Sequence, residues 1–171
     1  LITFDNIVDA IGEYERSQVF VNTPWKAYVN GDESAISMKA KKGALLFFRS
    51  LGNGGADCAS CHSGDFFTDE GFHVVAMPQV GRGKGNDNGV KSNDDFGRFR
   101  ESGLNIDKYA FRTPTLLNVE VTGPWTHAGA YTSLESVVRH YINPQQAIDA
   151  YDYSQLDPSV NAVDMMVNTQ F

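Results

Sequence analysis

The segment Cys58-Ala59-Ser60-Cys61-His62 constrains this chain more than any other feature of its sequence. Its C-x-x-C-H spacing is the attachment motif of a c-type haem, in which both thiols form thioethers with the haem vinyl groups. The histidine that follows at once is placed to bind the iron as the proximal ligand. The motif also accounts for both cysteines of the chain. We therefore expect one covalent haem, tethered by Cys58 and Cys61, with His62 on the iron.

Other uses of a C-x-x-C pair fit the sequence less well. A thioredoxin-like dithiol needs a preceding buried strand in a βαβ pattern, and the sequence shows neither. A zinc site needs a second ligand pair at short spacing. The remaining histidines, His73, His127 and His140, are scattered and make no such pair. A non-haem structural module with a Cys58–Cys61 disulfide is the other alternative.

The composition indicates one folded domain, or slightly more, with an acidic surface. The 171 residues are 42% hydrophobic, which is enough for an ordinary core. The formal charge of -7 argues against a nucleic-acid partner. No apolar run approaches the roughly 20 residues of a membrane span. No signal peptide is visible at Leu1, so we expect that it was removed or lies further upstream. Because c-type haems are attached after export, we expect a periplasmic protein.

Hydrophobic spacing predicts a mainly α fold of the cytochrome c type with long irregular loops. Apolar residues from Phe4 to Tyr14 follow helical spacing and predict a core helix. A short helix is expected over 24–28, and Ser37 is a plausible N-cap for a helix that reaches 48. Residues 132–135 have the form of a capping box, whose helix ends before Pro144. A further short helix is expected over 145–151. The glycine-rich stretch 79–103 is expected to be a long surface loop.

We divide the chain into three segments. Residues 1–33 form an N-terminal helical segment that leads into the haem domain, 34–153 the cytochrome c-like haem domain, and 154–171 a polar C-terminal tail. Gly43 and Phe47 lie four residues apart, shortly before the haem motif. In that arrangement, which resembles the first helix of many c-type cytochromes, the glycine admits a neighbouring helix and Phe47 covers the haem edge.

Longer stretches of the sequence resemble the C-terminal haem domain of the bacterial di-haem cytochrome c peroxidases, a family that includes the MauG-type enzymes. The most specific stretches are 111–119 (FRTPTLLNV) and 122–129 (TGPWTHAG). Shorter ones are 72–73, 77–78, 97–99 and 134–138. The resemblance implies an electron-transfer haem domain of a peroxidase. The family has two c-type haem domains, whereas this chain has one C-x-x-C-H motif. The second haem domain, which reduces hydrogen peroxide, is therefore expected upstream or in another chain. This haem would pass it electrons from a small donor protein or a protein substrate.

The resemblance also implies a sixth iron ligand. In the family this ligand is Met in ordinary peroxidases and Tyr in MauG-type enzymes, and counting from His127-Ala128-Gly129 places it at Tyr141. An anionic phenolate stabilises ferric iron relative to a thioether, which lowers the reduction potential. His140 is the neighbouring rival, and a Tyr141 that packs in the core is the structural alternative. The remaining thioether candidates are Met77, Met165 and Met166.

Further site residues follow from the same resemblance. Arg98 and Arg112 match arginines near the haem, where a guanidinium would pair with a propionate. His127 would border the haem or the electron path between the two haems. Backbone carbonyls of Thr122 and Pro124 would bind a calcium ion, a cation that prefers oxygen ligands. Exposed arginines and a locally hydrogen-bonded His127 are the structural alternatives. A stand-alone mono-haem electron carrier is the alternative function.

Overall fold

The computed structural model describes residues 2–80, 94–158 and 166–167 of the chain. It divides into two compact units, Leu1–Ala59 and Ser60–Phe171, which we describe separately. The division falls inside the C-x-x-C-H motif, not at residue 33 or 153. The three segment boundaries taken from the sequence therefore stay predictions.

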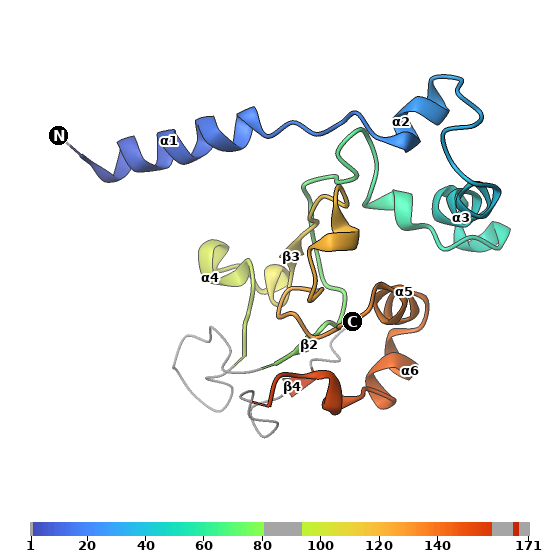
Figure 1. The fold of residues 1–171 in the computed structure, drawn as a ribbon. Helices are drawn as coiled ribbons and strands as arrows, with labels where there is room; N and C mark the ends of the chain where they lie inside the picture. Colours follow the sequence, from blue (N-terminus) through green and yellow to red (C-terminus); the bar gives the residue numbers. More distant parts are fainter. Residues whose placement is uncertain (1, 81–93, 159–165, 168–171) are drawn as a thin grey trace. The chain divides into compact units, whose positions relative to one another are not determined.

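The first unit consists of three α-helices, each begun by a capping side chain, and two 3-10 turns. The α-helices are α1 (Phe4–Ser17), α2 (Pro24–Val29) and α3 (Met38–Phe48), followed by the 3-10 turns η1 (Leu51–Asn53) and η2 (Cys58–Ser60) (Figure 1). The side chains of Thr3, Thr23 and Ser37 each accept a hydrogen bond from the backbone N–H three residues later. Such caps satisfy amide groups that the first turn leaves without partners. The three helices predicted in this part of the sequence are thus confirmed.

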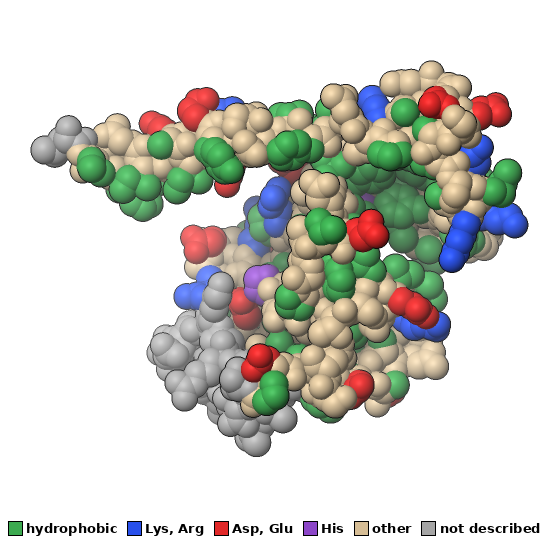
Figure 2. All heavy atoms as spheres, in the orientation of Figure 1, with side chains coloured by type: hydrophobic (Ala, Val, Ile, Leu, Met, Phe, Trp, Pro, Cys, Tyr) green, Lys and Arg blue, Asp and Glu red, His purple; other side chains and the backbone are tan. Residues whose placement is uncertain are grey.

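Helix α1 is amphipathic, but it is not the core helix that its periodicity predicts. None of its residues is buried. Its apolar side chains are visible along the helix in Figure 2, and Phe4 and Tyr14 are among the most exposed. Helical spacing of apolar residues predicts which face of a helix will be covered, but does not supply the element that covers it.

The second unit has more helix than strand, and its loops are long and irregular. Its helical elements are α4 (Phe99–Ser102), η3 (Asn105–Asp107), η4 (Val119–Val121), α5 (Leu134–Ile142), α6 (Pro144–Asp149) and η5 (Tyr153–Gln155). Strand β1 (Phe72–His73) pairs antiparallel with β3 (Phe111–Arg112), and β2 (Pro78–Gln79) with β4 (Met166–Val167). None of the helices in the described residues has the length and apolar character to cross a membrane. The predicted mainly helical fold with irregular loops is confirmed.

The core of the second unit lies where α5 and α6 meet the segment that precedes β2. Met77, Ala130, Tyr131 and Tyr151 form its buried cluster. Helix α5 begins one residue later than the capping box suggested, because the side chain of Ser133 accepts the Ser136 N–H. Asn143 ends α5 and caps α6, whose first residue is a proline as this position favours.

Parts of the glycine-rich stretch 79–103 are buried, so the described residues of this stretch do not all form a surface loop. The Gln79 side-chain amide holds the backbone N–H and C=O of Asp95, each at 2.8 Å. Asp94 is 1% exposed and accepts a hydrogen bond of 2.6 Å from the Tyr109 hydroxyl. Residues 81–93, between these contacts and at the centre of the expected loop, lie outside the described residues. So does Met165.

Candidate functional site

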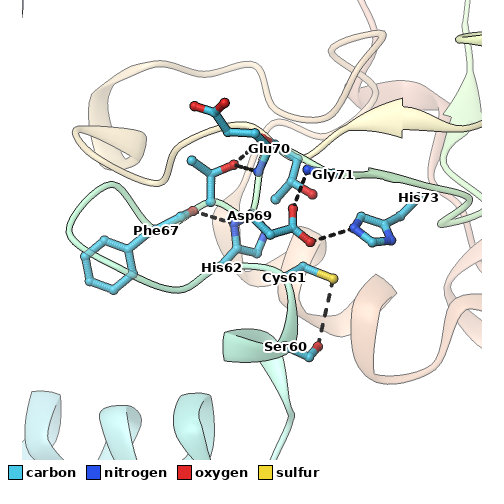
Figure 3. A network of polar contacts seen from close by, with 10 residues as sticks. Ser60, Cys61, His62, Phe67, Asp69, Glu70, Gly71 and His73 are labelled. Carbon is cyan, nitrogen blue, oxygen red and sulfur yellow. Dashed lines mark hydrogen bonds and ion pairs between the residues drawn. The ribbon is translucent and has the colours of Figure 1, made fainter.

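The imidazole of His62 is oriented as a metal-binding histidine requires. Its Nδ1 lies 2.9 Å from the carbonyl oxygen of Phe67 and donates to it (Figure 3). A carbonyl is only an acceptor, so the proton is on Nδ1 and the Nε2 lone pair is left for a metal. A backbone carbonyl behind a ligating histidine is the usual way in which its ring is held. The tight turn after the motif therefore leaves His62 Nε2 available to bind a metal.

Both cysteines of the motif are free thiols, as haem attachment needs. The Cys58 sulfur lies 3.8 Å from the carbonyl oxygen of Ala56, and burial raises the pKa of this thiol. The Ser60 hydroxyl donates a hydrogen bond to the Cys61 sulfur, with 3.9 Å between oxygen and sulfur. Both side chains are half-buried. With the orientation of His62, these observations fit a covalently attached c-type haem.

Three candidates for the sixth iron ligand lie in different surroundings. Tyr141 is on α5, and the residue is 48% exposed. His140 is completely buried, and both of its ring nitrogens are engaged. Nε2 lies 2.9 Å from the Val75 carbonyl and Nδ1 3.0 Å from the Tyr131 hydroxyl. Burial lowers the pKa of His140, so the neutral ring is favoured. Met77 is packed in the core.

Helix α5 exposes an apolar surface around Tyr141. Its neighbours on the helix, Val138 and Ile142, are 51% and 66% exposed. A contiguous apolar patch of this kind usually marks a surface that something covers. A porphyrin ring has the size and apolar character to do so, which is a second respect in which the chain fits a haem.

The two arginines differ in their contacts. Arg98 lies 3.3 Å from the carboxylate of Asp107, and its guanidinium is 4.2 Å above the ring of Phe72. Arg112 on β3 is exposed and makes no ion pair with the residues that the structure describes. Arg112 is therefore the better placed of the two to bind an external carboxylate.

The other residues singled out from the sequence either contact nearby side chains or are exposed. His127 hydrogen-bonds Asp95 at 2.9 Å and lies against the ring of Phe111, with centroids 3.9 Å apart. Phe47, in the first unit, packs edge-on against Phe48. Thr122 and Pro124 are exposed.

The structure also brings together three residues that the sequence analysis left apart. The donor atoms of Cys61, Asp69 and His73 all lie within 4.8 Å of one another. Asp69 and His73 form an ion pair of 2.8 Å. The hydrogen bond from His73 lowers the pKa of Asp69 to about 2, aided by the Gly71 N–H. The tight turns over 62–71, which cannot be inferred from hydrophobic spacing, bring these three side chains together.

Comparison with proteins of known type supports the haem assignment. No family model matches the chain. It is 37% identical over 139 residues to the methylamine utilization protein MauG of Methylorubrum extorquens. The MauG of Methylophilus methylotrophus is 32% identical over 140 residues, and the cytochrome c551 peroxidase of Pseudomonas aeruginosa 31% over 144. The chain is thus similar in sequence to MauG and to the bacterial cytochrome c peroxidases.

The chain matches only part of each of these relatives. The three alignments cover 80%, 82% and 84% of the chain, but 34%, 37% and 38% of the relatives. The chain thus spans about a third of the length of the curated relatives it matches. A solved structure of a MauG-like protein associated with microbial copper homeostasis has the same fold, with a TM-score of 0.61. The two sequences are 23% identical, and the alignment covers 81% of this chain and 40% of the solved one.

Proposed function

We propose that this chain is a c-type haem electron-transfer domain of a MauG-like di-haem cytochrome c peroxidase. It would relay electrons to a peroxide-reducing haem on an N-terminal domain outside this sequence. The observation that carries the proposal is the C-x-x-C-H motif with its His62 already oriented by the Phe67 carbonyl. The similarity to MauG and to cytochrome c peroxidases supports this class of reaction.

Each site residue has a distinct part in this proposal. When bound, a c-type haem supplies a reversible one-electron couple at its iron. Cys58 and Cys61 would hold it through thioethers, and His62 would bind its iron. Tyr141 would be the second protein ligand, because it is exposed whereas His140 and Met77 are buried in the core. A phenolate donor favours the ferric state, which suits a domain that stores oxidising equivalents.

Further residues complete the proposed site. Arg112 pairs with a haem propionate, and Arg98, already bound to Asp107, contributes less. Phe47 covers a haem edge, and the carbonyls of Thr122 and Pro124 bind calcium together with ligands from the absent domain. The electron donor is a small protein or a protein substrate. We propose a periplasmic location because c-type haem is attached there.

The test is to co-express the chain with haem-maturation machinery and to measure its mass and ferric spectrum. We expect the mass of one added haem and its loss in a Cys58→Ser, Cys61→Ser variant. A Tyr141→Phe variant should then change the ferric ligand-field bands. Tyr153→Phe is the matched control, because Tyr153 is 51% exposed and lies outside the proposed site. A bare peptide mass would exclude the haem function, and an unchanged Tyr141→Phe spectrum would exclude this ligand.

The alternative is a stand-alone mono-haem electron carrier. It has the same motif and the same His62 geometry, so the isolated haem spectrum does not separate the two. A fusion of the chain to the upstream haem domain of a relative separates the two functions. Peroxide turnover that depends on His62 favours the peroxidase domain, and peroxide turnover unaffected by His62→Gly favours the carrier.

A further inference from the structure

The surface around α4 and η3 is basic, although the chain as a whole is acidic. Residues 96–112 contain four Lys or Arg residues and two acidic ones, whereas the complete sequence has 14 and 21. Figure 2 shows Lys and Arg side chains on the part of the surface where Figure 1 has α4. A local charge opposite to that of the whole protein is a means by which a surface selects its partner.

Aromatic rings hold two of these basic side chains in place. The Arg98 guanidinium lies 4.2 Å from the centre of the Phe72 ring, and its Nε lies 3.3 Å from the Asp107 carboxylate. Lys108 Nζ lies 5.1 Å from the centre of the Phe99 ring. Cations that are already held in this way lose less side-chain freedom when a partner binds them.

Exposed apolar side chains accompany the basic ones. Leu104 is 59% exposed and Ile106 85%, and Phe72, in contact with Arg98, is 40% exposed. Because α4 and η3 contact each other, these apolar and basic side chains belong to one surface. Apolar and aromatic anchors together with arginine are typical of protein-binding surfaces. We call this surface the basic patch, and its residues are Phe72, Arg98, Arg100, Leu104, Ile106 and Lys108.

The basic patch lies beside the residues proposed to hold the haem. Phe72 is followed in β1 by His73, whose ring nitrogen lies within 4.8 Å of the sulfur of Cys61. Across the sheet, Phe72 is paired with Arg112, the residue proposed to bind a haem propionate. A partner bound on the patch would therefore lie close to the haem edge.

We propose that the basic patch docks the acidic face of a small redox protein that exchanges an electron with the haem of this chain. The inference rests on the proposed function and adds the chemistry of the partner. One electron passes from the partner to the haem iron, which oxidises the partner and reduces the iron, and no proton or group is transferred. Opposite charges speed the encounter of the two surfaces, and a basic partner is repelled from this one.

Electron exchange with two probes of opposite charge tests the chemistry of the partner. The full haem-loaded chain, in its ferrous form, is mixed in a stopped-flow instrument with ferric cytochrome c of the basic mitochondrial type. The second probe is the same cytochrome after succinylation, which replaces its lysine ammonium groups by carboxylates. Both directions of electron transfer use the same docked complex. We expect the succinylated probe to react at least about tenfold faster at low salt, and its rate to fall as salt is added. A basic probe that reacts as fast or faster would overturn the proposal.

Matched charge reversals separate the basic patch from the net charge of the chain. Arg100→Glu combined with Lys108→Glu should slow the reaction with the succinylated probe at least about tenfold at low salt. The control combines Lys39→Glu with Lys42→Glu, which changes the net charge equally at two exposed positions of α3. Equal slowing by the two double variants, or no slowing by the first, would refute the role of the patch.

Calorimetry distinguishes a failure of docking from a failure of the haem function. Binding of the ferric succinylated probe to the ferric chain involves no electron transfer, and the Arg100→Glu, Lys108→Glu variant should bind at least about tenfold more weakly. If the chain carries one haem but this variant binds as tightly as the unmodified chain, the docking proposal is wrong and the haem function stands. If the chain has a bare peptide mass, the haem function fails, and the same two titrations still decide whether the patch binds an acidic protein.

Discussion

Replacing His140 by alanine should destabilise the second unit more than any exposed substitution on α5. His140 is completely buried, and its two nitrogens join α5 to segments that are distant in sequence. Nε2 donates to the Val75 carbonyl, 65 positions away, at 2.9 Å. Nδ1 accepts from the Tyr131 hydroxyl at 3.0 Å. Alanine removes both bonds and the ring at once.

The expected cost can be worked out from these contacts. A buried polar group that loses its partner costs about 1–3 kcal/mol, and here two such groups, the Val75 carbonyl and the Tyr131 hydroxyl, lose theirs. The missing ring leaves a cavity, which adds a cost of its own. The better helix propensity of alanine returns a few tenths of a kcal/mol. We expect a loss of about 3–5 kcal/mol, a large share of the 5–15 kcal/mol typical of a domain.

Urea unfolding followed by far-UV circular dichroism measures this loss. Tyr131→Phe removes one hydroxyl and should cost about 1 kcal/mol. Because the two residues share a hydrogen bond, the double variant should be less destabilised than the sum of the two single variants. A cost below 1 kcal/mol for His140→Ala, or strict additivity with Tyr131→Phe, would refute the proposed role of His140 in the core.

Three further predictions concern ionisation, capping and backbone conformation. Burial raises the pKa of Tyr151 to about 12, above the unfolded value of about 10. The neutral Tyr151 side chain should therefore stabilise the fold fully below pH 10, and this effect should be lost as the pH rises through 12. In a titration followed by absorbance at 295 nm, Tyr151→Phe should remove the phenolate step that occurs at the highest pH. Ser133→Ala should lower the free energy of unfolding in urea by about 1 kcal/mol because it removes the N-cap of α5, whereas Thr132→Ala should lower it less. Equal losses would contradict Ser133 as the N-cap. Gly97→Ala and Gly103→Ala both force a side chain into a left-handed conformation, but only at Gly97 does the new Cβ collide with the Ala110 carbonyl. Gly97→Ala should thus lower the unfolding midpoint further, and an equal effect would contradict the packing.

Sequence reasoning succeeded where the deciding interactions are local. The starts of α2 and α3 follow from Thr23 and Ser37, whose side chains bond amides three residues ahead. The haem motif is equally local, since its chemistry lies within five residues. The Phe67 carbonyl that orients His62 is only five residues further along the chain.

Contacts between distant residues could not be predicted in this way. The resemblance favours Tyr141 as the ligand, but the sequence leaves its neighbour His140 as a rival. Packing against residues 75 and 131 buries one of them and leaves the other on the surface. Likewise, helical spacing marked the apolar face of α1 but could not tell that its residues would be exposed within the described structure.

The sequence by itself indicated the cofactor class and the starts of α2 and α3, because thioether chemistry and capping act over a single turn. The tertiary structure alone decided that His140 is buried and that Asp69 and His73 lie beside Cys61. The first outcome depends on packing against Val75 and Tyr131. The second depends on backbone turns at residues such as Phe67 and Glu70, which have positive φ angles that no apolar pattern encodes. Burial and proximity are properties of the folded chain, and they settle which of several chemically suitable side chains can act.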